Sequence, residues 1–325
     1  MKILVTGGLG FIGHNVVSLL EAQGHRVIIL DNQTNYGIID PEELQPLIEE
    51  RLTKLQTRNI NRVDIRDIRI EPIFAAGVDL VIHLASFPRQ KVVNANPILG
   101  SQTMSEGLLN LLELSVKYHV KKFVYVSSSM VYGNFRDTYF DGVSEDHPTN
   151  PIGQYGIMKL AGEWLVKDYQ RRTNMPYTIL RPSAVYGPLD VEDRVVSKFL
   201  LTAMRGGTIQ VNGAKESLDF TYVSDVADGI VSATLSDTTD NMTYNITRGR
   251  SHTLLESAEL AVKIAGQGNI QINKPDDSFP SRGQLNNTRA HNDFGFLPRV
   301  NIEQGFEEYY EWLKNSFYRT KKAIQ

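Results

Sequence analysis

The sequence predicts an α/β fold, in which a doubly wound parallel sheet is followed by a smaller C-terminal domain. Three observations lead to this prediction. Short and almost continuously apolar runs recur along the first 180 residues, with helix-like stretches between them. Such runs are typical of parallel strands that helices cover on both faces. A glycine-rich turn joins the first run to a helix, and the alternation of strand and helix stops after about residue 180.

Six runs are predicted to form the strands of the sheet. In chain order they are Lys2–Thr6, Arg26–Leu30, Ile60–Asp64, Asp79–His83, Lys122–Ser127 and Tyr177–Arg181. Right-handed crossovers through the intervening helices join successive parallel strands. After a loop rich in proline and glycine, the sequence predicts a helix over 195–207, a strand over 208–213, and helices over 254–266 and 301–317.

The end of the strand–helix alternation after about residue 180 predicts two domains. We expect residues 1–180 to form the first domain, with residues 217–247 returning to it. Residues 181–216 and 248–325 are expected to form the smaller one, over the carboxyl ends of the strands, where open α/β sheets bind their ligands.

Composition excludes several classes of protein. The chain has 325 residues, of which 41% are hydrophobic and 22% charged, and its net charge is −3. Without a long basic run, nucleic-acid binding is not expected. The absence of cysteine excludes disulfides and thiolate chemistry. The seven histidines are scattered, so no metal site is expected.

The apolar stretches and the N-terminal residues indicate the cellular compartment of the protein. No apolar stretch approaches the ~18 residues that a membrane-spanning helix needs, so no membrane association is expected. The chain enters a strand-like run at residue 2, which leaves no room for a signal peptide. We therefore expect a cytoplasmic protein.

The first strand ends in a loop that predicts a dinucleotide site. Gly7, Gly10 and Gly13 are three residues apart, and Gly8 with the last two also satisfies G-x-G-x-x-G. Glycines let the chain turn tightly and let backbone N–H groups approach a pyrophosphate at the helix N-terminus. Asp31 ends the second strand, 18 residues beyond Gly13. A carboxylate at this place binds ribose hydroxyls and repels a 2′-phosphate, which favours NAD over NADP.

A tyrosine and a lysine four residues apart lie on one face of a helix, where the ammonium can lower the pKa of the phenol. The pattern occurs four times, at Tyr118/Lys122, Tyr155/Lys159, Tyr310/Lys314 and Tyr318/Lys322. Only the second pair follows a strand that ends in three serines, Ser127 to Ser129. We therefore interpret the second pair as catalytic and the other three as structural.

Together these motifs resemble the extended short-chain dehydrogenases/reductases, specifically the NAD-dependent nucleotide-sugar epimerase/dehydratase family and, in character, its UDP-glucose 4-epimerase-like members. The resemblance spans essentially the whole chain. It rests on TGGLGFIG, DIRD, VIHLAS, SSSMVYG, YGIMK, LRPSAVYGP, DFTYVSDVADG and RGQLNNTRAHNDFGFLP. It implies a Rossmann fold, NAD as cofactor and a nucleotide-sugar substrate.

The resemblance also implies residue roles. The cofactor would contact Gly7, Gly10, Phe11 and Ile12 at the pyrophosphate, Asp31 and Asn32 at the ribose, Asp64 and Ile65 at the adenine, and Leu84, Ala85 and Ser86 along the dinucleotide. Tyr155 would be the base that removes a sugar hydroxyl proton. Lys159 would bind the nicotinamide ribose and lower the pKa of Tyr155. Counting back from VYG, the family's catalytic hydroxyl falls on Ser128, which would orient the reacting oxygen.

The family's members share oxidation of a sugar carbon and differ in the later steps of the reaction. The 4,6-dehydratases normally carry an Asp-Glu pair where this chain has Ser129 and Met130. Neither side chain can carry out that proton transfer, so 4-epimerisation is the preferred interpretation. A C4 dehydrogenase or ketoreductase is the main alternative, and a non-catalytic NAD-binding protein of the same fold is a third.

The substrate side departs from the family's pattern. Ala184 replaces a usual asparagine, Leu218 replaces an arginine that binds the nucleotide diphosphate, and Met104 replaces another asparagine. The second phosphate-binding arginine is expected at Arg282, and Arg194 or Arg205 could supply a further charge. The residues predicted to contact substrate are therefore Ser128, Ser129, Arg89, Arg205 and Arg282.

The resemblance finally implies a homodimer. The helix-forming stretches Ser101–Tyr118 and Gly153–Thr173 would pair between subunits as a four-helix bundle, as they do in relatives.

Overall fold

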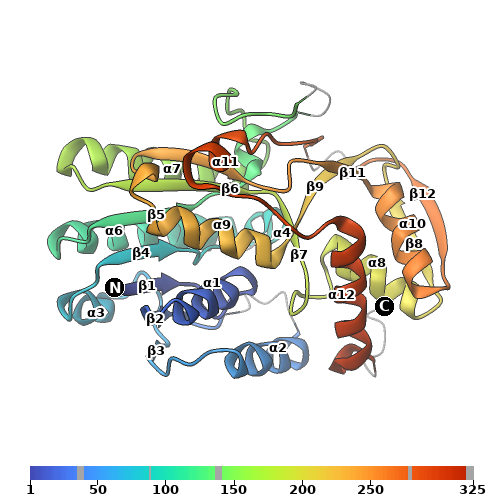
Figure 1. Ribbon diagram of the computed structural model, residues 1–325, viewed down its shortest axis with the longest axis horizontal. Helices are drawn as coiled ribbons and strands as arrows, with labels where there is room; N and C mark the ends of the chain where they lie inside the picture. The colour runs from blue at the N-terminus through green and yellow to red at the C-terminus, as the bar shows by residue number, and fades with distance from the viewer. Residues whose placement is uncertain (35–39, 88, 136–140, 277–279, 320–325) are drawn as a thin grey trace.

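The computed structural model describes residues 1–34, 40–87, 89–135, 141–276 and 280–319. Its centre is a parallel sheet of seven strands in the order β10-β6-β5-β4-β1-β2-β3 (Figure 1). The strands are β1 (Lys2–Thr6), β2 (Arg26–Leu30), β3 (Ile60–Asn61), β4 (Leu80–His83), β5 (Lys122–Val126), β6 (Tyr177–Pro182) and β10 (Met242–Ile246). Strand order reverses next to β1, which opens a crevice for ligands at that point.

Helices cover both faces of this sheet. On one face lie α1 (Phe11–Ala22), α9 (Val223–Leu235) and α11 (Thr288–Phe294), and on the other α3 (Glu71–Ala75), α6 (Gly107–Lys117) and α7 (Gln154–Thr173). The connections between strands also contain α2 (Pro41–Thr53), α4 (Gln90–Ala95) and α5 (Pro97–Ser101). A π-helical turn, Gln102–Glu106, joins α5 to α6. Alternate side chains of one strand enter different cores, because successive residues point to opposite faces. Ile3 and Val5 of β1 pack with α1 and α9, whereas Leu4 packs with α3, α6 and α7.

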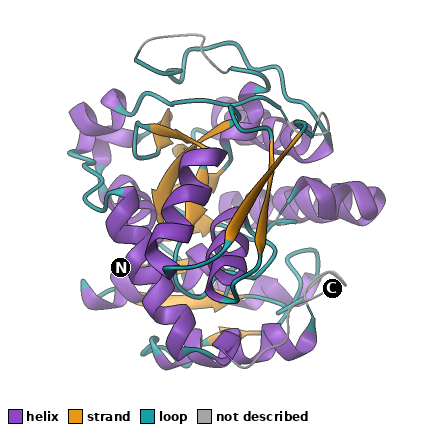
Figure 2. Cartoon of the chain, turned by 90° about the vertical axis from the view of Figure 1, so that its right-hand side faces the viewer, coloured by secondary structure: helices purple, strands orange, loops and turns teal. Residues whose placement is uncertain are grey.

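The rest of the chain forms a second core beside the carboxyl ends of the strands. It contains α8 (Val195–Met204), α10 (Leu254–Ala265), α12 (Ile302–Asn315) and the parallel pair β8 (Thr208–Asn212) and β12 (Asn269–Asn273). A three-stranded sheet, β11-β9-β7, runs between the two parts; its strands are β7 (Ala184–Tyr186), β9 (Ser217–Tyr222) and β11 (Ser251–Thr253). Figure 2 views the molecule from the side of this second core.

The predicted α/β fold with its doubly wound parallel sheet is confirmed, with two differences in its strands. The third strand was expected over Ile60–Asp64 but ends at Asn61. The chain turns there, because Asp64 accepts hydrogen bonds from the backbone and side chain of Arg66. The seventh strand, β10, was not predicted. It lies at the edge of the sheet and carries polar Thr243 and Asn245 among its apolar residues. Among the described helices, none is both long and apolar enough to cross a membrane.

Candidate active site

A cavity of about 1420 Å³ lies at the carboxyl ends of the strands, between the sheet and the second core. One half is lined by the loops that follow β1, β2 and β4, and the other by the ends of β5 and β6, by α8 and by residues 275–276 and 280–282. All of the predicted site residues line this cavity except Ser129 and Arg205. The fold therefore gathers into one space residues that are up to 275 positions apart, since Gly7 and Arg282 both lie on its wall.

The glycine loop makes a cradle that larger residues would fill. Gly7 has φ +70°, and a Cβ there would lie 2.8 Å from the Ala85 nitrogen. A Cβ on Gly13 would lie 2.0 Å from the Gly7 carbonyl oxygen. The Gly10 N–H donates to that same oxygen at 3.0 Å, which closes the turn into α1. The loop thus brings bare backbone to the N-terminus of a helix, as pyrophosphate binding requires.

Asp31 is held where the second strand meets this loop. Its Oδ2 accepts the Leu9 N–H at 2.9 Å and its Oδ1 accepts the Gln33 N–H at 2.8 Å. Burial raises the pKa of the Asp31 carboxyl, and the two hydrogen bonds oppose this shift. Beside it, Asn32 donates to Asp64 at 3.0 Å, and Asp64 also pairs with Arg66 at 2.8 Å. These contacts fix the carboxylates at the adenosine end of the predicted cofactor site.

The strand β4 ends in a buried histidine that is structural. The Thr6 hydroxyl lies 2.7 Å from Nδ1 of His83 and accepts the Ala85 N–H at 3.2 Å. Burial, and then the charge of Lys159, lower the pKa of His83 to about 3. This histidine is therefore neutral. Among the residues that the structure describes, no group of three or more histidine, aspartate or glutamate side chains could hold a metal ion.

The three serines after β5 point in different directions. Ser127 is buried and donates to Oε1 of Glu163 at 2.6 Å. Ser128 caps a short 3-10 helix, Ser129–Tyr132, by accepting the Met130 N–H at 3.2 Å, and it hydrogen-bonds the Tyr155 side chain. Only Ser128 of the three thus meets the tyrosine.

Ser129, which is predicted to contact substrate, is not part of the cavity lining. Its side chain is fully buried, and its hydroxyl donates to the Ser183 hydroxyl at 3.3 Å.

Tyr155 and Lys159 lie one turn apart on α7. The Lys159 ammonium donates to the Val126 carbonyl at 2.8 Å and lies 5.9 Å from the centre of the Tyr155 ring. Burial lowers the pKa of Lys159 to about 7. The expected lowering of the Tyr155 pKa by Lys159 is not found in the protein alone. Burial raises the pKa of Tyr155, and the groups that oppose this are Arg194, the Ser128 hydrogen bond and Arg282.

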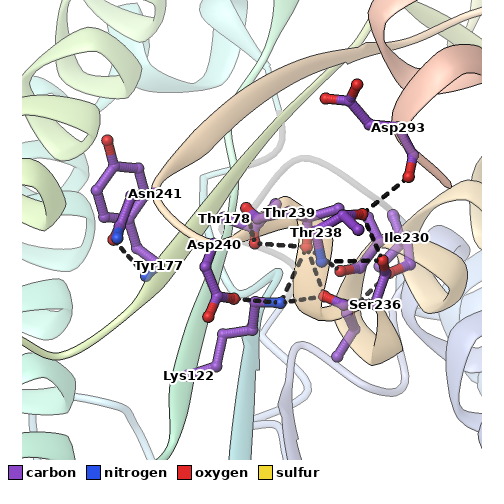
Figure 3. Close-up of polar contacts among 12 residues, drawn as sticks. Lys122, Tyr177, Thr178, Ile230, Ser236, Thr238, Thr239, Asp240, Asn241 and Asp293 are labelled. Atoms are coloured by element: carbon purple, nitrogen blue, oxygen red, sulfur yellow. Dashed lines mark hydrogen bonds and ion pairs between the residues drawn. The ribbon is translucent and has the colours of Figure 1, made fainter.

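The first of the other three Tyr/Lys pairs has structural partners. Lys122 is buried and contacts the Ser236 carbonyl at 2.6 Å, the Thr239 hydroxyl at 2.9 Å and the Asp240 carboxylate at 2.7 Å (Figure 3). Its partner Tyr118 donates to Glu71 at 2.8 Å.

The last two pairs lie far along the chain, on α12 and beyond it. Lys314 pairs with Glu311 at 2.8 Å, and the Tyr318 hydroxyl donates to Glu43. Lys322 lies outside the described residues.

Basic side chains line the substrate half of the cavity. Burial, together with the like charge of Arg194, lowers the pKa of Arg282 to about 10. The Nε atoms of Arg282 and Arg194 are buried and have no hydrogen-bond partner among the described residues. Arg194 lies 3.8 Å from the Asp190 carboxylate, and Arg89 donates to the Asp193 carbonyl and carboxylate, both at 2.9 Å.

Arg205, which is predicted to contact substrate, is not part of the cavity lining. It follows the last residue of α8 and pairs with Glu192 at 2.8 Å.

The three departures from the family's pattern take apolar roles. Ala184 and Leu218 line the cavity without offering a charge. Met104 is buried against Phe87 and the partly buried Tyr155.

Two functional regions contain residues that the sequence analysis missed. Glu163 and Arg181 form a buried ion pair with 2.6 Å between Oε2 and Nη2, directly behind Ser127. The spacing Tyr155, Lys159, Glu163 repeats a four-residue step on one helix face and could have indicated the glutamate. Arg51 of α2 donates to the Leu9 carbonyl at 3.0 Å and the Leu189 carbonyl at 2.6 Å, so it joins the two halves of the cavity. No local pattern in the sequence indicates that contact.

The model of the NAD dependent epimerase/dehydratase family matches residues 3–247. The chain belongs to this family. A putative UDP-glucose 4-epimerase of Methanocaldococcus jannaschii is 31% identical, over 97% of this chain and 99% of its own. A dTDP-glucose 4,6-dehydratase of Streptomyces niveus is 28% identical, over 97% of this chain and 94% of its own.

Among solved structures, the UDP-glucuronic acid 4-epimerase of Bacillus cereus, in complex with UDP-glucuronic acid and NAD, superposes with a TM-score of 0.88. It is 26% identical, and the match covers 97% of this chain and 99% of that one. This protein is therefore an NAD-dependent enzyme of the nucleotide-sugar epimerase and dehydratase class. The cradle at Gly7 and Gly13, into which no Cβ fits, agrees with NAD as its cofactor.

Proposed function

We propose that this member of the family is a nucleotide-sugar 4-epimerase. The observation that carries the proposal is that Ser128 hydrogen-bonds Tyr155, next to Lys159, and is followed by Ser129 and Met130. At the two positions that come after Ser128, the chain has no group that can transfer a proton in a dehydration. The pair Ser128 and Tyr155 can therefore support oxidation of a sugar carbon and its reduction again, and Ser129 and Met130 supply no acid or base for a dehydration.

In this proposal Tyr155 accepts the proton of the C4 hydroxyl while Ser128 holds the hydroxyl oxygen by a hydrogen bond. The glycine loop after β1 would hold NAD, which would supply reversible hydride transfer at C4, so that the hydride could return to the other face of the sugar. The base must be a phenolate, and three groups of the protein favour it: the charges of Arg194 and Arg282 and the hydrogen bond of Ser128. Lys159, fixed on the Val126 carbonyl, orients the nicotinamide ribose.

The positions after Ser128 argue against dehydration. Elimination of water needs an acid for the leaving hydroxyl and a base for the neighbouring C–H. Ser129 is buried and bonded to Ser183, so it has no access to a sugar. The Met130 thioether has no proton to give and is a weak acceptor.

The nucleotide diphosphate is held, in our proposal, by Arg282 and Arg194. Both line the cavity, and each has a buried Nε without a hydrogen-bond partner among the described residues, although that of Arg194 lies 3.8 Å from the Asp190 carboxylate. Their like charges interact, which is unfavourable until an anion lies between them. Arg194 therefore takes the role that an arginine at the position of Leu218 has in relatives.

Tyr155→Phe tests this function, with Tyr118→Phe as the matched control from the same sequence pattern. We expect Tyr155→Phe to reduce epimerisation by at least about 100-fold and to retain NAD, since general acid–base catalysis contributes about that much. Tyr118→Phe should stay within twofold of the wild type, because Tyr118 contacts Glu71 far from the cavity. Unchanged turnover in Tyr155→Phe would refute the mechanism.

We also propose a homodimer through α6 and α7. Large apolar side chains are exposed on these helices and on α5: Ile98, Leu99, Leu109, Ile157 and Trp164. Large exposed apolar side chains gathered on neighbouring helices are typical of a surface that a partner covers. Ile157→Arg is expected to give a monomer in light scattering at micromolar concentration, where the wild type gives a dimer. A monomeric wild type would contradict this part of the proposal.

A further inference from the structure

One buried carboxylate joins the two elements that carry the catalytic groups. Glu163 lies on α7, one turn beyond Lys159 and two turns beyond Tyr155. Its Oε1 accepts the hydroxyl of Ser127, at the end of β5, at 2.6 Å. Ser127 is the residue immediately before Ser128. This one hydrogen bond therefore links α7, which carries Tyr155, to the end of β5, which Ser128 follows.

The Glu163 carboxylate is held in place, because Arg181 of β6 donates two hydrogen bonds to it. Nε of Arg181 donates to Oε1 at 2.8 Å and Nη2 donates to Oε2 at 2.6 Å. Arg181 also donates to the Tyr132 hydroxyl at 2.9 Å. Ser127, Glu163 and Arg181 are all nearly or completely buried. Bidentate, charge-assisted pairs of this kind allow little variation in geometry. Ser127 is therefore hydrogen-bonded to a carboxylate whose position is fixed.

The direction of Ser128 depends on this tie. Successive side chains of an extended chain point to opposite sides. Ser128 has extended backbone, with φ −163° and ψ 152°. When Ser127 points back to Glu163, Ser128 must point forward into the cavity, toward Tyr155.

We infer that Ser127 and Glu163 are positioning residues that hold the Ser128 hydroxyl at its working distance from Tyr155. Glu163 is not part of the cavity lining, and the Ser127 hydroxyl is bound to Glu163. The inference rests on the role proposed above for Ser128 and Tyr155, and it concerns the oxidation step, which the epimerases and dehydratases of this class share. A misplacement of reacting groups by about 1 Å can slow catalysis about 100-fold, so the tie should affect the rate of this step more than binding.

A merely structural role predicts something else. The charge of Glu163 is already balanced by Arg181 without Ser127. In a merely structural role, the Ser127 hydroxyl would only make a buried hydrogen bond and so add to the stability of the fold. Its loss would then lower the melting temperature and leave the rate constant unchanged.

The test compares Ser127→Ala, which removes the hydroxyl, with Ser127→Thr, which keeps it. Purified holoenzyme is mixed with the nucleotide sugar that the wild type oxidises fastest in a panel of UDP-, GDP-, CDP- and dTDP-sugars. Reduction of bound NAD is followed at 340 nm in a stopped-flow instrument, over a range of sugar concentrations. Bound NAD and melting temperature are measured on the same samples.

We expect Ser127→Ala to reduce NAD at least tenfold more slowly at saturation, with half-saturation and NAD content within twofold of the wild type. Ser127→Thr should keep at least half of the wild-type rate. A wild-type rate in Ser127→Ala would overturn the inference. So would a Ser127→Thr protein as slow as Ser127→Ala, or a loss of rate that only tracks loss of NAD or of folded protein.

Failure of the proposed function gives a different result. If bound NAD is reduced but no C4 epimer forms, 4-epimerisation is wrong, while the comparison of the Ser127 variants still decides the inference.

Discussion

The Arg282 guanidinium is expected to destabilise the protein without substrate and to bind the anionic part of the substrate. Burial and the charge of Arg194 lower its pKa from 12.5 to about 10. One pKa unit corresponds to about 1.4 kcal/mol, so the charged form opposes folding by about 3 kcal/mol. This penalty is fully present below pH 10 and is lost only as the pH rises toward 12.5.

Arg282→Met removes that charge and keeps a long apolar side chain. We expect the free energy of unfolding of the substrate-free protein at pH 7 to rise, by up to about 3 kcal/mol. The KM for the nucleotide sugar should rise about 30-fold or more, because truncating one partner of a buried, hydrogen-bonded charge pair costs about 2–5 kcal/mol. Urea unfolding and initial-rate kinetics on the same preparations measure the two effects.

Arg205→Met is the matched control. Arg205 is balanced by Glu192 and lies outside the cavity lining, so its loss should leave KM within twofold of the wild type and not raise stability. A less stable Arg282→Met protein with an unchanged KM would refute the reasoning, because Arg282 would then be an ordinary structural cation.

Three further predictions concern the cofactor half of the cavity. Gly13→Ala should purify without NAD, since the new Cβ would lie 2.0 Å from the Gly7 carbonyl oxygen; a normal ratio of absorbance at 260 and 280 nm would contradict this. Burial lowers the pKa of Lys159 to about 7, so its charge opposes folding below pH 7 and this effect fades as the pH rises toward 10.5. Lys159→Met should therefore stabilise the NAD-free protein more at pH 6 than at pH 9 in urea unfolding, and an equal effect at both values would count against it. Asp31→Asn should reduce the preference for NAD over NADP in titrations of both cofactors, and an unchanged preference would assign that selectivity to another residue.

The strands of the sheet could be predicted where they are apolar on both faces. Lys2–Thr6 and Arg26–Leu30 are central or covered strands, and the structure has them with the predicted bounds. Strand β10 escaped prediction because an edge strand needs no continuous apolar run, and its Asn245 instead accepts the Tyr132 hydroxyl. An apolar run in the sequence indicates a strand that is buried on both faces, and this signal is weakest for a strand at the edge of the sheet.

The candidate site could be predicted only as far as its motifs are local. The glycine loop and the Tyr155/Lys159 pair are each contained in one short segment, and position along the chain singled out, from four pairs, one that lines the cavity. The direction of Ser127 depended instead on Glu163, 36 residues later, and on Arg181 in another strand. The sequence could not decide whether Arg194 or Arg205 lines the cavity. These residues lie at opposite ends of α8, and only the folded structure shows that Arg205 turns to Glu192.

The central claim is reversible oxidation at C4 without loss of the hydride, and one measurement tests it directly. Wild-type protein is incubated with UDP-glucose, UDP-glucuronic acid and the other sugars of the panel, and the products are resolved by proton NMR while absorbance at 340 nm is recorded. We predict that one sugar is converted to its C4 epimer until both are at equilibrium, with no net accumulation of NADH. A 4-keto-6-deoxy sugar as the product, or NADH that accumulates in proportion to sugar consumed, would contradict the account.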